Sequence, residues 1–180
     1  MKHIYTIRHG KPQNIDSKKR FLGHTDIPLS LEGACSLAPL KGFFKDRPPA
    51  TIISSPLSRC IQSAQIIFGR DRDIIRHWGF AEINMGTWDN CTFEYIKQKF
   101  PNEFKARGEN PCTYRVASGE SFLDVQLRAV SALEEIGHYP EPIAVVSHQG
   151  LIRCLMCHID NKPLSELFKY DIPYASMHEL

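Results

Sequence analysis

Residues 4–10 read IYTIRHG, an apolar run that ends in an arginine, a histidine and a glycine. Two further runs of the same kind follow, because residues 51–54 read TIIS and residues 143–147 read IAVVS. Short, continuous runs rich in β-branched residues are typical of strands buried in a parallel sheet. In the stretches between these runs, apolar residues recur at helical spacing. Together these patterns predict an α/β protein, a three-layer sandwich with a mostly parallel central sheet flanked by helices.

Each of these runs leads into a basic residue. Arg8 and His9 end the first run, Arg59 comes shortly after the second, and His148 follows the third directly. Because α/β proteins place their chemistry just past the carboxyl ends of parallel strands, we expect these four side chains to meet in one pocket. Such a cluster suits an anion with several oxygens, and a neutral histidine among cations is a nucleophile suited to phosphorus.

Length and composition favour one domain over residues 1–180. The chain has 180 residues, 42% of them hydrophobic, and no Ser-, Gly- or Pro-rich linker divides it. Its 22 basic and 20 acidic residues leave a net charge of +2, which does not suggest nucleic acid or a membrane surface as a partner. We find neither a signal-peptide core nor a membrane-length apolar run, and therefore expect a cytoplasmic enzyme.

Apolar residues at helical spacing predict four helices. The first starts at Ser30 as N-cap and ends before Pro48, and the second runs from about Pro56 to Gly69. The third has Ser118 as its cap and ends at Gly137, and the fourth covers about 150–159. The remaining segments are predicted as a long loop over the pocket at 11–29, short strands at 73–77, 167–172 and 175–180, and a partly helical cap or pocket wall at 79–119.

An ordered set of motifs runs along nearly the whole chain. It comprises Arg8-His9-Gly10; Gly23, Asp26, Pro28-Leu29 and Gly33; Ser55-Pro56-Leu57 with Arg59; Glu82 with Gly86-Thr87-Trp88; Gly119-Glu120-Ser121; and Ser147-His148-Gln149-Gly150. In this order the motifs resemble those of the histidine phosphatase superfamily, also called the phosphoglycerate mutase-like proteins. The resemblance implies the phosphoglycerate mutase-like fold and a phosphoric monoester hydrolase acting on a small-molecule phosphomonoester.

The resemblance and the residue chemistry assign the same catalytic roles. His9 attacks phosphorus and forms a phosphohistidine that water later cleaves. Arg8 and Arg59 are expected to bind phosphate oxygens with their planar donor groups, and neighbouring cations would lower the pKa of His9. His148 is expected to hydrogen-bond the phosphoryl oxygens opposite His9, and the sequence leaves its protonation state open. We expect no cofactor and no metal, since the guanidinium groups neutralise the anion and no Asp/Glu cluster at ligand spacing accompanies them.

Glu82 is the expected general acid, because a departing alkoxide must gain a proton and a partly buried carboxylic acid can supply it. The alternative for Glu82 is a solvated loop acid. We assign Asn14 and Gln149 to substrate binding together with Arg8, Arg59 and His148. Many relatives carry Glu-Thr after Arg-His-Gly, whereas this chain has Lys-Pro at 11–12, so Lys11 either adds charge for the substrate or is solvated.

The resemblance leaves the substrate open. Mutases of the family are generally longer, so a phosphatase is favoured. Within the phosphatases, residues 144–150 and 26–29 and the overall size look most similar to the α-ribazole phosphatases of cobalamin biosynthesis. A broad-specificity sugar-phosphate phosphatase, a phosphoglycerate mutase and a non-catalytic phospho-ligand binder stay as alternatives. Four aromatic side chains could stack on a flat base, namely Trp88, Phe93, Phe104 and Tyr114, and the alternative is that they belong to the ordinary core.

The six cysteines are expected to be reduced and mostly buried, since a chain of this size does not need disulfides to fold. Residues 154–158, CLMCH, match the spacing of a c-type haem attachment site. Their apolar helical context and the missing export signal argue against haem. A zinc site would need a second Cys or His pair, which is not apparent.

Overall fold

The computed structural model describes residues 3–13 and 18–180, and these form a sheet with the strand order β3-β2-β4-β1-β5. The strands are β1 (Ile4–Arg8), β2 (Thr51–Ser54), β3 (Ile75–Arg76), β4 (Ile143–Ser147) and β5 (Met177–Glu179). Strand β4 pairs in parallel with β1 and β2, and β2 pairs in parallel with β3. The edge strand β5 runs antiparallel to β1. The predicted mostly parallel sheet is confirmed.

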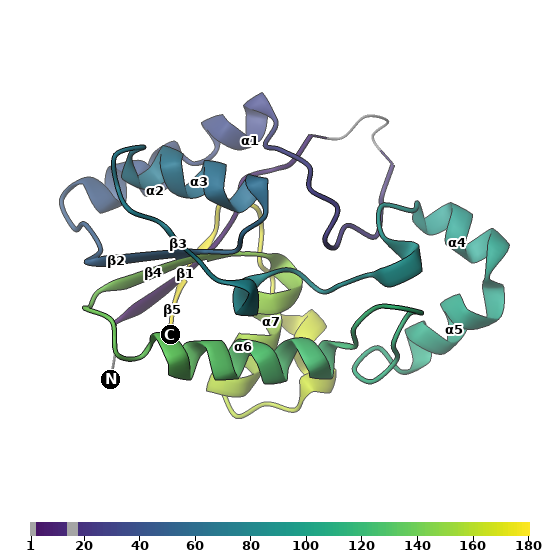
Figure 1. The fold of residues 1–180 in the computed structure, drawn as a ribbon. Coiled ribbons are helices and arrows are strands. Elements are labelled where there is room, and N and C mark those ends of the chain that lie inside the picture. Colours follow the sequence, from purple (N-terminus) through teal and green to yellow (C-terminus); the bar gives the residue numbers. More distant parts are fainter. Residues whose placement is uncertain (1–2, 14–17) are drawn as a thin grey trace.

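Helices cover both faces of this sheet, and the three-layer sandwich is confirmed (Figure 1). One face carries α1 (Leu31–Cys35), α2 (Ala38–Lys45) and α3 (Ser58–Phe68), and the other carries α6 (Phe122–Ile136) and α7 (Gln149–Ile159). Every residue of β2 and β4 is buried as a result. Burial on both faces explains why these strands lack alternating polarity.

Side chains that alternate along each strand enter two separate cores. Ile52 and Val146 pack toward the α2–α3 layer with Phe44, whereas Ile53 and Val145 enter the core beneath α6 and α7. Successive strand residues point to opposite faces of a sheet, so each strand joins both cores. The two helix layers are thereby fixed on either side of the same strand ends.

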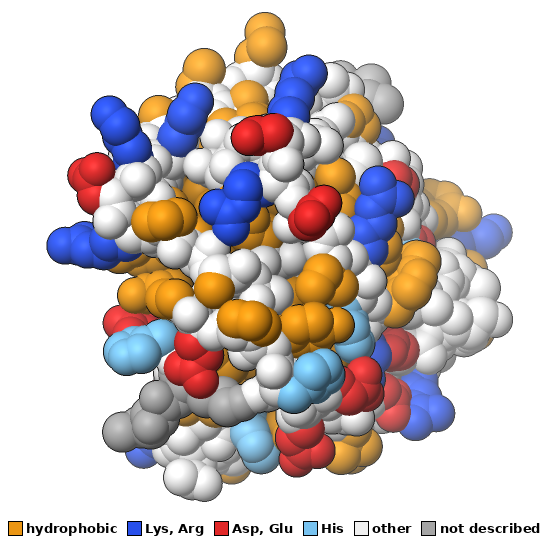
Figure 2. All heavy atoms as spheres, turned by 60° about the vertical axis from the view of Figure 1, so that its left-hand side comes forward, with side chains coloured by type: hydrophobic (Ala, Val, Ile, Leu, Met, Phe, Trp, Pro, Cys, Tyr) orange, Lys and Arg blue, Asp and Glu red, His pale blue; other side chains and the backbone are white. Residues whose placement is uncertain are grey.

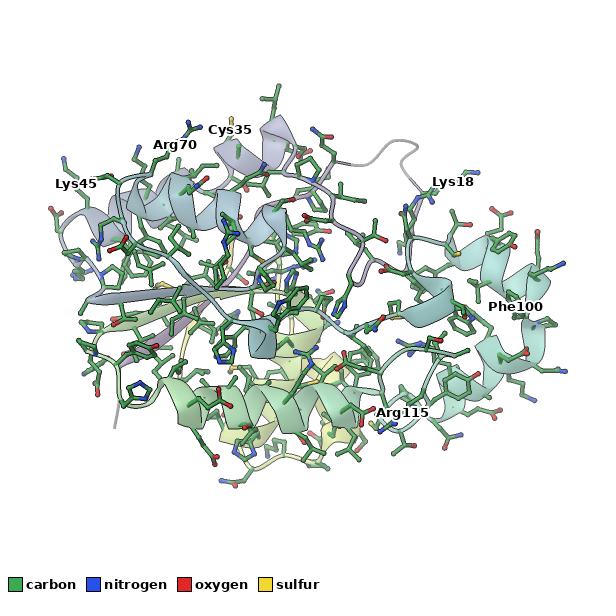
Figure 3. All side chains as sticks on the ribbon, viewed as in Figure 1. Lys18, Cys35, Lys45, Arg70, Phe100 and Arg115 are labelled. Atoms are coloured by element: carbon green, nitrogen blue, oxygen red, sulfur yellow. The ribbon has the colours of Figure 1, made fainter. Side chains whose placement is uncertain are left out.

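The segment 79–119 lies beyond the carboxyl ends of the strands. It begins within the 3-10 helix η1 (Trp78–Phe80) and contains a second short 3-10 helix, η2 (Gly86–Trp88), and the helices α4 (Phe93–Lys99) and α5 (Pro101–Glu109). Helices α4 and α5 extend to one side of the sandwich, with Phe100 at their junction (Figures 1 and 3). The fully buried Ile96 attaches α4 to the main core.

Two details of the predicted elements are wrong. Ser118 does not cap α6; it has a positive φ of 59° in the preceding turn. Ser121 caps the helix instead, because its hydroxyl accepts the Asp124 N–H while the Asp124 carboxylate accepts the Ser121 N–H, a reciprocal capping box. The strand expected at 167–172 is also absent from the described residues, where η3 (Leu164–Lys169) turns the fully buried Leu167 toward α7.

The first predicted helix begins at Ser30 as expected, with the Gly33 N–H donating to the Ser30 hydroxyl at 3.0 Å. It is interrupted after Cys35, so that α1 and α2 are separate helices. The second helix confirms its prediction, since α3 ends at Gly69, whose φ of 102° favours glycine. Arg59 lies in the first turn of α3.

Basic side chains gather on one part of the outer surface (Figure 2). In the view of Figure 2 most of them cover the upper half of the face, over the α1–α3 layer, while histidines lie in the lower half. Lys45 and Arg70 point away from the sheet (Figure 3). Among the described residues, none of the helices has the length and apolar character needed to cross a membrane.

Candidate active site

The strand ends bring two histidines together. In register, Arg8 of β1 lies opposite Ser147 of β4, so His9 and His148 leave the sheet at the same edge. Their ring centroids are 5.0 Å apart with an interplanar angle of 65°. The exposed fractions of these residues are only 4% for His9 and 0% for His148. The predicted meeting of the two side chains is therefore present.

One hydrogen bond defines the tautomer of His9. Its Nδ1 is 2.6 Å from the Gly10 carbonyl oxygen, which can only accept, so Nδ1 carries the proton and the Nε2 lone pair is free. Burial holds the pKa of His9 well below its usual value, and the charges of Arg59 and Arg8 act in the same direction. His9 is thus neutral at neutral pH and carries an available lone pair, as a nucleophile requires.

Gly10 itself is required by a close approach between two loops. A Cβ atom at Gly10 would lie 2.3 Å from the carbonyl oxygen of Gly33 in α1. The Gly10 N–H donates to the Ser63 hydroxyl at 3.1 Å, which attaches the same peptide to α3. The carbonyl that orients His9 is therefore held from two sides.

Within the part of the chain that the structure describes, Arg8 and Arg59 each keep a buried N–H group without a hydrogen-bond partner. Arg8 Nη1 donates to the Ile172 carbonyl at 2.5 Å, and its guanidinium carbon lies 3.7 Å from the centroid of the Tyr174 ring. Arg59 donates to two loop carbonyls, those of Gly23 at 2.7 Å and Thr25 at 3.0 Å. The Nε atoms of both arginines are buried, and neither has a hydrogen-bond partner among the described residues.

These two orphaned donors indicate an anion site. Buried N–H groups are nearly always hydrogen-bonded, and a missing partner costs free energy of about 1–3 kcal/mol. Neither guanidinium forms an ion pair with a carboxylate in the described part of the chain. Both guanidinium charges act on His9, so an oxyanion beside that ring would balance them.

His148 is neutral like His9. Burial lowers its pKa well below the usual value, with further lowering by Arg59 and His9. Its Nε2 lies 2.7 Å from the Ser55 hydroxyl oxygen and 3.3 Å from the Cys60 sulfur. The ring is therefore fixed by groups at the end of β2 and in α3.

Glu82 is buried, with an exposed fraction of 8%, so it is not a solvated loop acid. Its Oε1 accepts the Ile83 N–H at 2.9 Å, and its Oε2 accepts the Gly150 N–H at 3.2 Å. A Cβ atom at Gly150 would lie 2.5 Å from Oε1, so this glycine gives the carboxyl group its place at the start of α7. The Glu82 carbonyl accepts from Arg128 at 2.9 Å, which holds the backbone.

The remaining residues predicted to bind substrate have different surroundings. Asn14 lies outside the described residues. Gln149 Nε2 donates to the Ile172 carbonyl at 3.1 Å, the oxygen that also accepts from Arg8. Lys11 forms an exposed ion pair with Glu32 at 2.7 Å, and that hydrogen bond raises the pKa of Lys11.

A cavity of about 380 Å³ opens beside Glu82 and Gln149. Five phenylalanines and three arginines are among its lining residues: Phe21, Phe93, Phe104, Phe122 and Phe168, with Arg20, Arg107 and Arg153. The expectation that Trp88 and Tyr114 face the substrate is wrong. Trp88 is buried in the core, and Tyr114 packs against it with ring centroids 6.3 Å apart.

Arg107 and Arg153 are cavity residues that sequence reasoning missed. The Arg107 guanidinium lies between the rings of Phe21 and Phe122, at 5.8 and 5.5 Å from their centroids, and its Nε is buried without a partner among the described residues. Arg153 Nε donates to the Tyr170 carbonyl at 2.9 Å. Neither residue follows a strand, so strand-end position could not identify them. Tyr174 was missed for the same reason.

Comparison with known proteins agrees with this architecture. The model of the histidine phosphatase superfamily (branch 1) matches residues 4–180. A 6-phosphofructo-2-kinase/fructose-2,6-bisphosphatase of Caenorhabditis elegans is 31% identical over 180 residues, which cover 98% of this chain and 38% of the relative. The fructose-2,6-bisphosphatase of Saccharomyces cerevisiae is 28% identical over 99% of this chain and 39% of its own length. The chain thus spans less than half of these relatives.

Solved structures show the same fold. An α-ribazole phosphatase from Shigella flexneri superposes with a TM-score of 0.87 at 22% identity, covering 97% of this chain and 88% of that one. A mycobacterial glucosyl-3-phosphoglycerate phosphatase superposes with a TM-score of 0.86 at 24% identity, covering 99% and 92%. With the family match over residues 4–180 and the paired histidines and arginines at the strand ends, this chain belongs to the histidine phosphatase superfamily.

Proposed function

We propose that this chain hydrolyses phosphomonoesters through a phosphohistidine on His9. The supporting observation is the free Nε2 of a neutral His9 beside the unpaired Nε–H groups of Arg8 and Arg59. Nε2 attacks phosphorus while the bond from phosphorus to the ester oxygen breaks. Water then attacks the phosphohistidine, and inorganic phosphate leaves as the Nε2 lone pair is restored.

The surrounding groups support both steps. Arg8 and Arg59 stabilise negative charge on the phosphoryl oxygens, and His148 donates a hydrogen bond to one of them. Glu82 in its acid form gives a proton to the departing oxygen, then accepts one from the attacking water as a carboxylate. One residue serves as acid and base in turn, so the proton balance closes over the cycle.

The decisive experiment is His9→Ala assayed with p-nitrophenyl phosphate. Turnover should fall to background, because no other group can become the covalent nucleophile. The exposed His158→Asn is the matched control and should retain wild-type turnover. Rapid quenching of the wild type should trap phosphate on protein that is stable in base and labile in acid. Near wild-type turnover of His9→Ala, or binding of phosphate without any turnover by the wild type, would refute the proposal.

For the substrate, the first candidate is α-ribazole 5′-phosphate. The phenylalanines that line the cavity beside Glu82 could stack on its flat base, as Phe93 and Phe104 were expected to do. The fold shared with the Shigella α-ribazole phosphatase is consistent with this candidate at the level of architecture. Broad activity on sugar phosphates is an alternative with the same chemistry.

A second candidate has its own observation. Arg107 and Arg153 bring two cations into the cavity, and neither has a carboxylate partner among the described residues. Glu82 and Asp171 lie close enough to act electrostatically on Arg153, but neither forms an ion pair with it. A leaving alcohol that carries a second anionic group would pair with the two arginines, as in a sugar bisphosphate. The names of the curated relatives point to the same substrate class. α-Ribazole offers no second anion, so the arginines favour the bisphosphate.

The two candidates separate in one set of measurements. We would compare kcat/KM for α-ribazole 5′-phosphate, fructose 2,6-bisphosphate and 3-phosphoglycerate, in the wild type and in Arg107→Met. A bisphosphate substrate predicts that Arg107→Met lowers its kcat/KM by at least about tenfold, or 1.4 kcal/mol, and leaves p-nitrophenyl phosphate unaffected. A preference for α-ribazole 5′-phosphate that survives Arg107→Met would instead establish the first candidate. Transfer of the phosphoryl group from the phosphohistidine back to phosphoglycerate, instead of to water, would indicate a mutase.

A further inference from the structure

Ser55 is the first residue after β2 and contacts His148 directly. Its hydroxyl oxygen lies 2.7 Å from Nε2 of His148, and both residues have an exposed fraction of 0%. A hydrogen bond of this length between two fully buried groups is shielded from water. It is therefore positioned to select one tautomer of the imidazole.

The direction of this bond follows from the other contacts of Ser55. The Leu57 N–H donates to the Ser55 oxygen at 3.4 Å, so the hydroxyl hydrogen still needs an acceptor. The Nε2 lone pair of His148 is a strong acceptor at 2.7 Å, whereas the nearby sulfur of Cys60 is a weak one. If Nε2 carried the proton instead, the buried hydroxyl would lose its good acceptor. Ser55 therefore donates, and Nε2 accepts.

The consequence appears at the other ring nitrogen. A neutral imidazole that accepts at Nε2 carries its hydrogen on Nδ1. Within the described ranges, the hydrogen-bonding atom found near Nδ1 is the Cys60 sulfur at 3.9 Å, which is a weak partner. Nδ1–H is thus left to donate to a phosphoryl oxygen. In the opposite tautomer this nitrogen would present a lone pair and repel the same oxygen.

We propose that Ser55 is a positioning residue, which holds neutral His148 in the Nδ1–H tautomer so that the ring presents a donor to the phosphoryl group. The inference rests on the proposed phosphohistidine chemistry. The proposed role adds Ser55 to that chemistry as a residue whose hydroxyl acts only through His148. It also explains why a serine stands where β2 ends, since the same oxygen accepts the Leu57 N–H as the chain turns into α3.

The test compares Ser55→Ala with Ser55→Thr, which keeps the hydroxyl, and with Ser54→Ala as matched control. Ser54 is also 0% exposed, and its hydroxyl donates to the Ser55 carbonyl at 2.8 Å rather than to a histidine. We expect Ser55→Ala to lower kcat by about tenfold with a smaller change in KM. Ser55→Thr should recover most of kcat, and Ser54→Ala should stay near wild type. Thermal unfolding identifies variants that fold.

The second readout is the ¹⁵N NMR spectrum of the imidazole nitrogens in the resting protein, with His148→Gln used for assignment. In the wild type, Nδ1 of His148 should carry the hydrogen and Nε2 should not, and Ser55→Ala should populate the opposite tautomer. An Nε2–H tautomer in the wild type, or an unchanged tautomer and kcat in folded Ser55→Ala, would overturn the inference. The tautomer is measured without substrate, so failure of the proposed function would be seen separately, as absent turnover.

Discussion

The pKa values of His9 and His148 are lowered by the same causes, burial first and then the charge of Arg59. The free site thus holds two neutral rings and two guanidinium groups, a net positive charge in a shielded place. An entering phosphate dianion balances this positive charge. The site is therefore suited to a dianion, and chemistry begins with His9 already deprotonated at Nε2.

The leaving group provides the test of Glu82. Glu82→Gln should slow hydrolysis of alkyl phosphates by about 10²-fold or more, because the alkoxide then departs without a proton. p-Nitrophenolate is stable without a proton, so p-nitrophenyl phosphate should lose much less. Steady-state rates on both esters provide the measurement.

Glu120→Gln is the control for this substitution. Glu120 is half-buried and pairs with Arg128 at 2.8 Å. Its loss should affect both esters equally and mainly through stability. Equal losses on both esters in Glu82→Gln would assign Glu82 a structural role instead.

At the scale of elements, the turn from β4 into α7 couples backbone geometry to the acid. His148 ends this turn, and Gly150 in the first turn of α7 donates its N–H to Glu82. Helix α7 is packed against α6 and η3, so the turn cannot move freely. The position of the carboxyl group is set by the helix.

Gly150→Ala should therefore act like a mild form of Glu82→Gln. The new methyl group would lie 2.5 Å from Glu82 Oε1 and displace it, so alkyl phosphate hydrolysis should fall by about tenfold or more while the fold persists. Gly42→Ala in α2 is the matched control, because a Cβ there meets no atom within 4 Å. The control should raise the free energy of unfolding by about 0.5–1 kcal/mol without affecting rates. Unchanged alkyl phosphate rates in Gly150→Ala would contradict this coupling.

For the whole molecule, the two buried neutral histidines make stability depend on pH. In the unfolded chain the two histidines have pKa values of about 6.5, whereas in the folded protein their pKa values lie well below that. As the pH falls below about 6.5, the unfolded chain binds protons that the folded protein excludes, so the free energy of unfolding falls. The two groups contribute a slope of at most about 2.7 kcal/mol per pH unit.

Urea unfolding between about pH 5 and 7.5 measures this slope. The double variant His9→Asn, His148→Gln should show a shallower dependence. Part of the slope should stay, since burial also lowers the pKa of His178. An identical slope in the wild type and the double variant would show that these rings are not the source.

Activity should also survive EDTA, because Arg8 and Arg59 supply the charge that a metal ion would otherwise provide. No group of three or more His, Cys, Asp or Glu side chains in the described ranges could hold a metal ion. The assay is turnover of p-nitrophenyl phosphate with and without the chelator. Loss of activity that magnesium restores would refute the expectation.

Much of this architecture was readable from local sequence. The unbroken apolar runs at 4–7, 51–54 and 143–147 identified the three central strands, because burial on both faces permits no polar alternation. Parallel strands end at one edge, so position after a run was enough to group Arg8, His9, Arg59 and His148. The cap of α6 was predicted at the wrong serine, although the sequence carries a signal for Ser121, because Asp124 follows it three residues later and Ser118 has no such partner.

Other features depended on the path of the whole chain. Arg107 and Arg153 reach the cavity from α5 and α7, and Ser55 meets His148 across 93 residues of sequence. Residues 167–169 belong to a 3-10 helix, and 170–172 form no strand, because packing of Leu167 against α7 overrides the strand-like pattern. Local patterns record whether a side chain is buried, so the sequence by itself determined the sheet and the strand-end cluster. Which buried groups meet, and which N–H groups lack a partner, depends on contacts between distant segments, so only the tertiary structure decided the histidine tautomers and the anion site.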